Sequence, residues 1–111
     1  MEKDKIYTQH ILDAISAIEK FIATKNYNAF CNDELLQNGV IRELEVIGEA
    51  SKKLSSEFKD SIPSLPWKDI AGMRDKLIHD YFSVDLDAVW KAATRDIEDL
   101  KNALIKKTGQ K

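Results

Sequence analysis

The sequence predicts an all-α protein, an antiparallel four-helix bundle built by a single domain over residues 1–111. Three observations favour this fold. Apolar residues recur at spacings of three and four along four long segments, the pattern of an amphipathic helix with one buried face. Two prolines and four glycines are too few turn residues for a fold of many short strands. The connections between the segments are short, as they are between antiparallel neighbours in a bundle.

Composition limits the function classes. The chain is 43% hydrophobic and 32% charged, which is typical of a folded domain. Its net charge of −2 excludes a globally basic nucleic-acid binder, although a local basic cleft could still hold RNA. No apolar run approaches the roughly 18 residues of a membrane span, and the N-terminus does not read as a signal peptide. We therefore expect a cytoplasmic protein with no membrane partner.

The first predicted helix covers residues 4–24. Its apolar stripe comprises Ile11, Leu12, Ile15, Ile18, Phe21 and Ile22. His10 lies beside this stripe with no second metal ligand nearby, so we interpret it as a surface or boundary histidine. An asparagine-rich loop follows over residues 26–32, and either Asn32 or Asp33 is the predicted N-cap of the next helix.

The second predicted helix extends from Asp33 to Phe58. Its stripe comprises Leu36, Val40, Ile41, Leu44, Ile47, Leu54 and Phe58. Gly39 and Gly48 fall inside it, where each costs roughly 1 kcal/mol of helix propensity relative to Ala. They therefore indicate the close approach of a neighbouring helix, or a bend. We expect a solvated face formed by Arg42, Glu43, Glu45 and Glu49; alternatively, Arg42 or Glu49 lines a cleft.

The third predicted helix has Pro66 in its first turn, after a connector over residues 61–66. The residues that share one face of it are Trp67, Ile70, Ala71, Arg74, Leu77, Ile78 and Tyr81. Arg74 thus lies in the middle of an otherwise apolar stripe. Local conflicts of this kind tend to occur at functional sites.

The fourth predicted helix follows a break at Ser83-Val84-Asp85, and Asp85 can cap it. Its apolar residues recur at spacings of three and four towards the C-terminus. They are Leu86, Val89, Trp90, Ala93, Ile97, Leu100 and Leu104. No internal repeat and no low-complexity segment interrupts the four helices, which supports a single bundle.

The residue types around Arg74 suggest acid–base chemistry on a phosphodiester. His79 titrates near neutral pH and can take a proton from a ribose 2′-OH, and Arg74 offers a fork of donors to phosphate oxygens. Asp75 lies four residues before His79 and could orient its ring. Cys31 is the only cysteine, which argues against a cysteine-based zinc site, and we expect no metal and no other cofactor.

Helix geometry separates Arg74 from His79. Five residues place their side chains about 140° apart around an ideal helix, whereas Arg74 and Tyr81 are nearly eclipsed. One straight helix cannot aim Arg74 and His79 at one small target, so either the helix loosens near Ser83 or a second chain completes the site. In a twofold dimer, two arginines and two histidines could converge.

Structural roles remain open for the same residues. His79 could be polar surface near a helix end, and Arg74 could be a structural arginine paired with a carboxylate of the bundle. Tyr81 and Phe82 could be ordinary core aromatics.

Arg74-x4-His79-x-Tyr81 resembles the R-x4-H-x-Y signature of HepT-like proteins, in the HEPN superfamily of helical ribonucleases. Three flanking segments extend the resemblance: residues 42–50, 65–72 and 82–90. The resemblance implies a HEPN-type bundle and a homodimeric, metal-independent endoribonuclease with Arg74 and His79 as the catalytic pair. It also implies a toxin of a toxin–antitoxin pair, neutralised when a minimal nucleotidyltransferase transfers AMP from ATP to Tyr81.

Three functions follow as hypotheses. The first is a toxin ribonuclease that cuts single-stranded or tRNA-like RNA. The second is a non-catalytic, nucleotide-binding or accessory module that supports a minimal nucleotidyltransferase. The third, a structural helical adaptor, leaves the unusual position of Arg74 unexplained.

Overall fold

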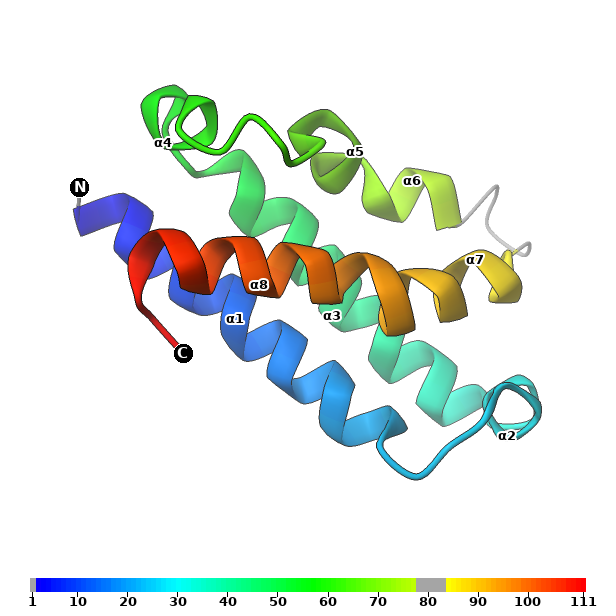
Figure 1. Ribbon diagram of the computed structural model, residues 1–111. Helices are drawn as coiled ribbons and strands as arrows, with labels where there is room; N and C mark the ends of the chain where they lie inside the picture. Colours follow the sequence, from blue (N-terminus) through cyan, green and yellow to red (C-terminus); the bar gives the residue numbers. More distant parts are fainter. Residues whose placement is uncertain (1, 78–83) are drawn as a thin grey trace.

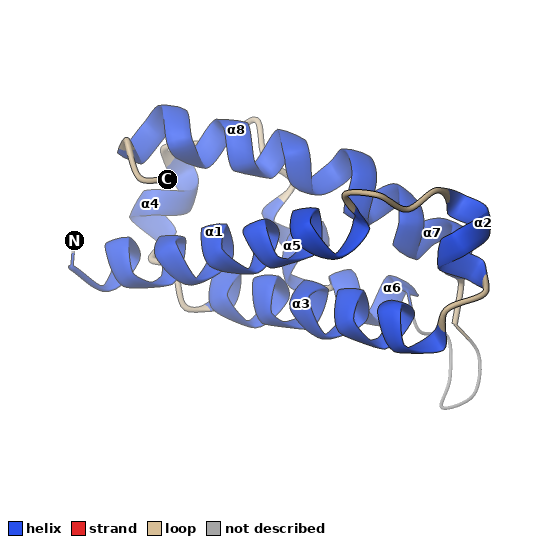
Figure 2. Cartoon of the chain, turned by 90° about the horizontal axis from the view of Figure 1, so that it is seen from below, coloured by secondary structure: helices blue, strands red, loops and turns tan. Residues whose placement is uncertain are grey.

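The computed structural model describes residues 2–77 and 84–111. The elements in chain order are α1 (Glu2–Ile22), α2 (Tyr27–Cys31), α3 (Glu34–Lys52), α4 (Ser56–Asp60), α5 (Trp67–Ala71), α6 (Met73–Leu77), α7 (Leu86–Lys91), the π-helical turn η1 (Ala92–Asp96) and α8 (Ile97–Thr108). Figure 2 shows only helices and connecting loops in the described part, which confirms the all-α prediction.

The helices form an antiparallel bundle (Figure 1). Three positions are held by long rods, namely α1, α3 and the continuous run α7–η1–α8, and the short helices α4, α5 and α6 together take the fourth. Successive rods run in opposite directions, so both termini lie at the same end (Figure 1). α3 lies at the centre of this arrangement, because it packs against both α1 and the α5–α6 segment.

The core between the rods is apolar. It is formed by buried residues of every long helix, among them Ile11, Ile15, Ile18, Phe30, Val40, Leu44, Ile47, Val89, Ile97, Leu100 and Leu104. All but Phe30 lie on predicted apolar stripes. Phe30 belongs to α2, which lies within the stretch 26–32 that is predicted from the sequence to be a loop. No helix in the described ranges is long and apolar enough to cross a lipid bilayer.

Local capping explains why α2 forms within the asparagine-rich stretch. The Asn26 side chain accepts a hydrogen bond from the backbone N–H of Ala29 at 2.8 Å and so caps the helix. Phe30 then packs its ring against Trp90 of α7, with the ring centroids 5.2 Å apart. The next helix begins where expected, because the Asp33 carboxylate accepts from the N–H of Leu36 at 3.0 Å.

The second helix is shorter than predicted. α3 ends at Lys52 instead of Phe58, and α4 starts separately under a cap from Ser55. Asp4 of α1 accepts hydrogen bonds from both the N–H and the hydroxyl of Ser55, each at 2.7 Å. The end of α3 therefore depends on a contact between two residues that are 51 positions apart in sequence. The periodicity of apolar residues along one helix cannot reveal such a contact.

The third helix is interrupted at Gly72. α5 stops there and α6 begins at Met73, so the single continuous helix that was predicted is wrong. Upstream, Trp67 holds the proline-containing connector in place, since its indole N–H donates to the carbonyls of Lys59 and Ile62 at 3.0 and 3.1 Å. The residues of this segment that face the core are Ile70, Met73 and Leu77.

The last rod follows its prediction. The Asp85 side chain accepts from the N–H of Ala88 at 3.0 Å and caps α7. The rod continues through η1 into α8 and ends at Gly109, which has φ +74°, a left-handed conformation that glycine adopts without strain.

Candidate active site

Gly48 of α3 determines how closely the third segment approaches. A Cβ atom at this position would lie 3.2 Å from the carbonyl oxygen of Ala71 and 3.3 Å from that of Ile70. Both oxygens are backbone atoms at the end of α5, so a side chain at residue 48 would push α5 away. The predicted close approach of a neighbouring helix at Gly48 is confirmed, and α6 consequently starts next to α3.

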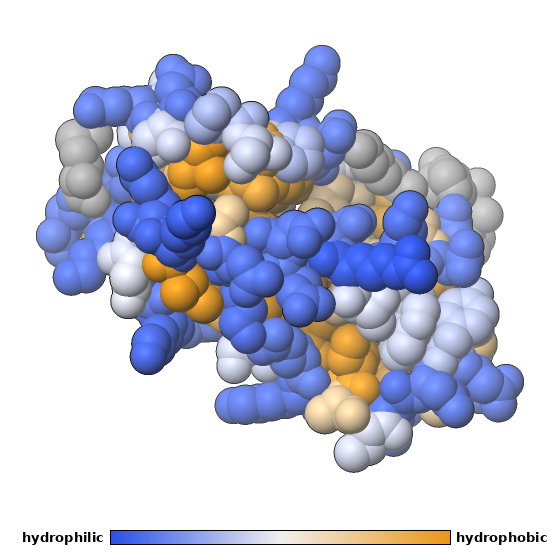
Figure 3. All heavy atoms as spheres, in the orientation of Figure 1, coloured by the Kyte–Doolittle hydropathy of each residue, from blue (hydrophilic) through white to orange (hydrophobic). Residues whose placement is uncertain are grey.

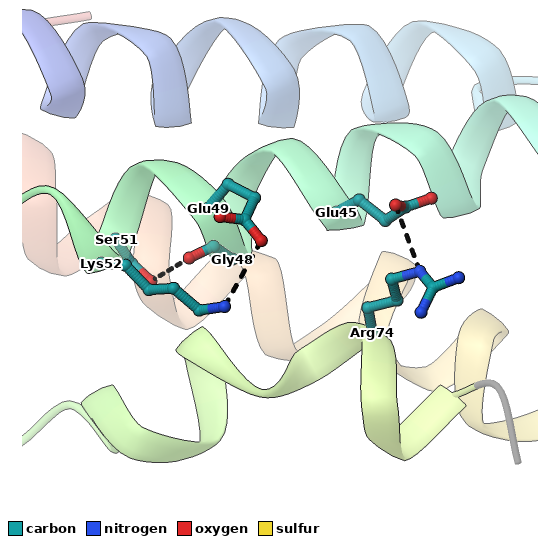
Figure 4. Close-up of polar contacts among 6 residues, drawn as sticks. All are labelled: Glu45, Gly48, Glu49, Ser51, Lys52 and Arg74. Atoms are coloured by element: carbon teal, nitrogen blue, oxygen red, sulfur yellow. Dashed lines mark hydrogen bonds and ion pairs between the residues drawn. The ribbon is translucent and has the colours of Figure 1, made fainter.

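This placement brings Arg74 of α6 to Glu45 of α3. The Arg74 Nε lies 3.2 Å from Glu45 Oε2, and Figure 4 shows this contact made by Nε of the guanidinium. The ion pair therefore fixes the stem of the guanidinium through one nitrogen. The terminal fork is the part of an arginine that matches phosphate geometry.

The exposure of this pair indicates its role. The Arg74 side chain is 54% exposed and that of Glu45 is 31% exposed. Ion pairs with this degree of solvent contact contribute only about 0–1 kcal/mol to stability. The main consequence of the Arg74–Glu45 ion pair is thus the orientation of the guanidinium, and its contribution to the stability of the fold is small.

The prediction that Arg74 lies within an apolar stripe is wrong. Met73 and Leu77 face the core, and Arg74 faces solvent and α3. The buried residues Ile70, Met73 and Leu77 are spaced by three and four, so the core face passes through Met73 and Arg74 lies beside it. The structure instead shows the alternative that the sequence left open, an arginine paired with a bundle carboxylate.

A hollow of about 140 Å³ adjoins the pair. It is lined by Glu45, Gly48, Glu49, Lys52, Ala71, Arg74 and Asp75. Within α3, on one side of the hollow, Lys52 Nζ lies 3.3 Å from Glu49 Oε1, and the Ser51 hydroxyl donates to the carbonyl of Gly48 at 2.7 Å (Figure 4). Three carboxylates face two cations here, so attraction for a phosphate comes from the guanidinium fork rather than from a basic surface.

Two of the predicted site residues lie outside the described part of the chain. His79 and Tyr81 fall within residues 78–83, so the separation of Arg74 from His79 and the convergence of two chains stay predictions. Asp75 is described and exposed, beside Arg74 on the hollow, but its predicted contact with His79 stays untested for the same reason.

Sequence reasoning missed Glu45 as the partner of Arg74. Glu45 is predicted from the sequence to lie on a solvated face. Only the contact at Gly48, which brings α3 and α6 together, could have indicated its pairing with Arg74. Arg42 and Glu49 are exposed and line a second hollow of about 300 Å³ between α1 and α3, as the alternative interpretation allowed. His10 is an exposed residue of that hollow, in agreement with its interpretation as a surface histidine.

The surroundings offer no evident metal cage. Among the residues that the structure describes, no group of three or more histidine, cysteine, aspartate or glutamate side chains is arranged to hold a metal ion. The chemistry that the described side chains can supply is orientation of an anion by Arg74.

Comparison with known proteins gives the family. Residues 11–106 match the sequence profile of a family described as "Ribonuclease HepT-like". The chain belongs to the HepT-like ribonuclease family. The match covers α2 to η1 completely and most of α1 and α8, so it encloses Glu45, Gly48 and Arg74.

Curated relatives agree with this family. A Thermococcus cleftensis protein named "Probable ribonuclease HepT" is 46% identical over 97 residues, which cover 87% of this chain and 88% of that protein. A Methanocaldococcus jannaschii protein named "Gamma-glutamylcyclotransferase and putative RNase MJ0434" is 45% identical over 107 residues, 96% of this chain. This HepT-like chain spans only 48% of that second protein. No solved structure matches the chain significantly.

Proposed function

We propose that this HepT-like chain is the toxin of a toxin–antitoxin pair and acts as a metal-independent endoribonuclease. Its active form is a homodimer, and a minimal nucleotidyltransferase neutralises it by transferring AMP to Tyr81. The observation that carries the proposal is the Arg74–Glu45 pair, which holds the guanidinium through Nε at the edge of a hollow. Membership of a ribonuclease family supports RNA as the substrate.

Each residue has a defined part in the cleavage step. The imidazole of His79 takes the proton from a ribose 2′-OH, and the 2′ oxygen then attacks the neighbouring phosphorus. The bond from phosphorus to the 5′ oxygen breaks, and that oxygen takes a proton from the protonated His79 of the second protomer. The products are a 2′,3′-cyclic phosphate and a 5′-hydroxyl.

Arg74 stabilises the transition state of this reaction. Negative charge accumulates on the non-bridging phosphate oxygens, and the terminal guanidinium N–H groups donate to them. Glu45 is a positioning residue, since it fixes the fork without occupying it. DNA lacks the 2′-OH, so the same site cannot cut it by this route.

The deciding experiment measures cleavage of a quenched fluorescent single-stranded RNA by the purified protein in EDTA. We expect cleavage of the RNA and none of DNA of the same sequence. Arg74→Ala and His79→Ala should each lower kcat/KM by about 100-fold or more, the magnitude of one acid–base or electrostatic group. Arg95→Ala is the matched control, because Arg95 is an exposed arginine of η1 that does not line the hollow.

Mixing tests the homodimer in the same assay. The unsubstituted and His79→Ala proteins, mixed so that they exchange subunits, should lose more activity than dilution explains, because a mixed dimer holds only one of the two histidines that the cleavage step needs. Full activity in both single variants, or loss of cleavage in EDTA alone, would overturn the proposed chemistry. A stable complex with the nucleotidyltransferase from a dimer that cuts no RNA would favour the accessory-module hypothesis instead.

A further inference from the structure

A second surface lies on the opposite side of α6 from Glu45. It is a groove of about 350 Å³ between the α5–α6 segment and the α7–η1–α8 rod. Figure 3 shows hydrophobic atoms at the surface between the α4–α5 segment and α8. Met73 and Leu77 line one wall, and Ala88, Ala92 and Leu100 line the other. None of these residues takes part in the proposed cleavage.

The groove has an elongated shape suited to a helix. Its wall on the last rod extends from Ala88 to Leu100, a rise of roughly 18 Å at 1.5 Å per residue. That is the length of about twelve helical residues. An amphipathic helix lays apolar side chains at spacings of three, four and seven into a groove of this kind.

Charge identifies the kind of occupant. Among the described residues of the rim, Asp96 and Asp99 are exposed carboxylates, and Lys91 carries an ammonium group. A nucleic acid would be repelled here, whereas lysine or arginine side chains beside an apolar helix face would be attracted.

We propose that this groove binds a cationic amphipathic helix of a protein partner. Apolar side chains of the partner fill the floor between Ile70 and Ala92, and its basic side chains meet Asp96 and Asp99 at the rim. Binding of a partner helix in the groove does not depend on ribonuclease activity. The experiment on the groove and the experiment on the cleavage site can therefore give different outcomes.

The test uses two fluorescein-labelled peptides of about fourteen residues, long enough for the groove. Both carry leucines at helical spacing, one with lysines on the flanks and the other with glutamates in the same places. Fluorescence anisotropy with the full chain should show binding of the lysine peptide only. Asp96→Asn combined with Asp99→Asn should weaken that binding by about tenfold, since two rim ion pairs are lost.

Two further variants separate the groove from general electrostatics. Asp13→Asn with Glu98→Gln removes the same charge from exposed positions outside the groove and should leave the affinity unchanged. Ala88→Leu fills part of the floor from a half-buried position and should reduce binding while the protein stays folded by circular dichroism.

Several outcomes would overturn the inference. These are no binding of the lysine peptide, equal binding of the glutamate peptide, and equal weakening by the control pair of substitutions. A change in dimer dissociation on Ala88→Leu without any effect on peptide binding would assign the groove to a second copy of the chain.

Discussion

Arg74 illustrates how one side chain can be both anchored and available. The contact at Nε restrains the guanidinium (Figure 4), while the side chain, 54% exposed, stays accessible to a ligand. Lysine would carry the charge without the fork, so Arg74→Lys is not a conservative substitution at this position. The motif identified Arg74 from sequence, but its partner required the packing of α3 against α6.

Tyr81 gives the prediction at the residue scale. Incubation with ATP and the cognate nucleotidyltransferase should add AMP to the protein and abolish RNA cleavage, because each added phosphate brings bulk and negative charge beside the site. Intact-protein mass spectrometry measures the addition, and Tyr81→Phe should remove it.

Tyr27→Phe is the control for this labelling. Tyr27 is an exposed tyrosine, 40% accessible, so access alone would not prevent its modification. A hydrogen bond with Cys31, with smaller contributions from desolvation and nearby negative charge, raises the pKa of Tyr27, which makes its hydroxyl a poorer nucleophile. Unchanged labelling of Tyr81→Phe, or loss of labelling in Tyr27→Phe, would contradict the assignment.

At the scale of elements, helix starts were more predictable than helix ends. Asp33 and Asp85 cap α3 and α7 through contacts three residues away, which a sequence displays directly. The end of α3 involves the Asp4–Ser55 contact, and the separation of α5 from α6 occurs where α5 meets α3 at Gly48. Those features are tertiary, so periodicity extended the second and third helices too far.

Gly48→Ala tests the crossing of α3 and α5. Alanine favours the helix by about 1 kcal/mol, but its Cβ must displace backbone oxygens at 3.2 and 3.3 Å. We expect the two effects to offset each other to within about 1 kcal/mol in stability. Cleavage should nevertheless fall about tenfold, because α6 and Arg74 shift relative to Glu45.

Gly39→Ala provides a matched comparison in the same helix. A Cβ there would lie 3.3 Å from the Phe21 ring, an exposed side chain that can rotate away. Thermal unfolding should show equal or higher stability, and RNA cleavage should be unchanged. If Gly39→Ala lost as much activity as Gly48→Ala, the role of the α3–α5 crossing would be refuted.

For the whole molecule, the sequence predicted the class of fold and most of the core, since burial follows periodicity. It did not predict that α4 is separate from α3, or that α5 and α6 take the place of one continuous third helix. Of the site, the motif residues were predicted, whereas Glu45 and the groove depend on helices distant in sequence.

Acid stability is a property of the whole bundle that Asp4 should control. Burial of Asp4 raises its pKa, but the hydrogen bonds from Ser55 and the nearby positive charge of Lys3 act together to leave the pKa below its ordinary value. A lowered folded pKa stabilises the protein above the unfolded value of about 3.9, and this stabilisation is lost as pH falls further.

Thermal unfolding of Asp4→Asn measures the effect. At pH 7 we expect a loss of about 1–2 kcal/mol, the usual contribution of hydrogen bonds to a charged group. The difference from the unsubstituted chain should shrink below about pH 4. Asp13→Asn, at an exposed position of the same helix, should change the Tm little at either pH. A difference between Asp4→Asn and the unsubstituted chain that stays constant with pH would exclude the carboxylate as its cause.

The position of α6 between two surfaces has a thermodynamic consequence. This helix of five residues presents Arg74 towards α3 and Met73 and Leu77 towards the groove. A rigid helix that short cannot shift at one face and stay fixed at the other. Occupancy of the groove and affinity for RNA would therefore be reciprocal, each ligand changing the dissociation constant of the other by the same factor.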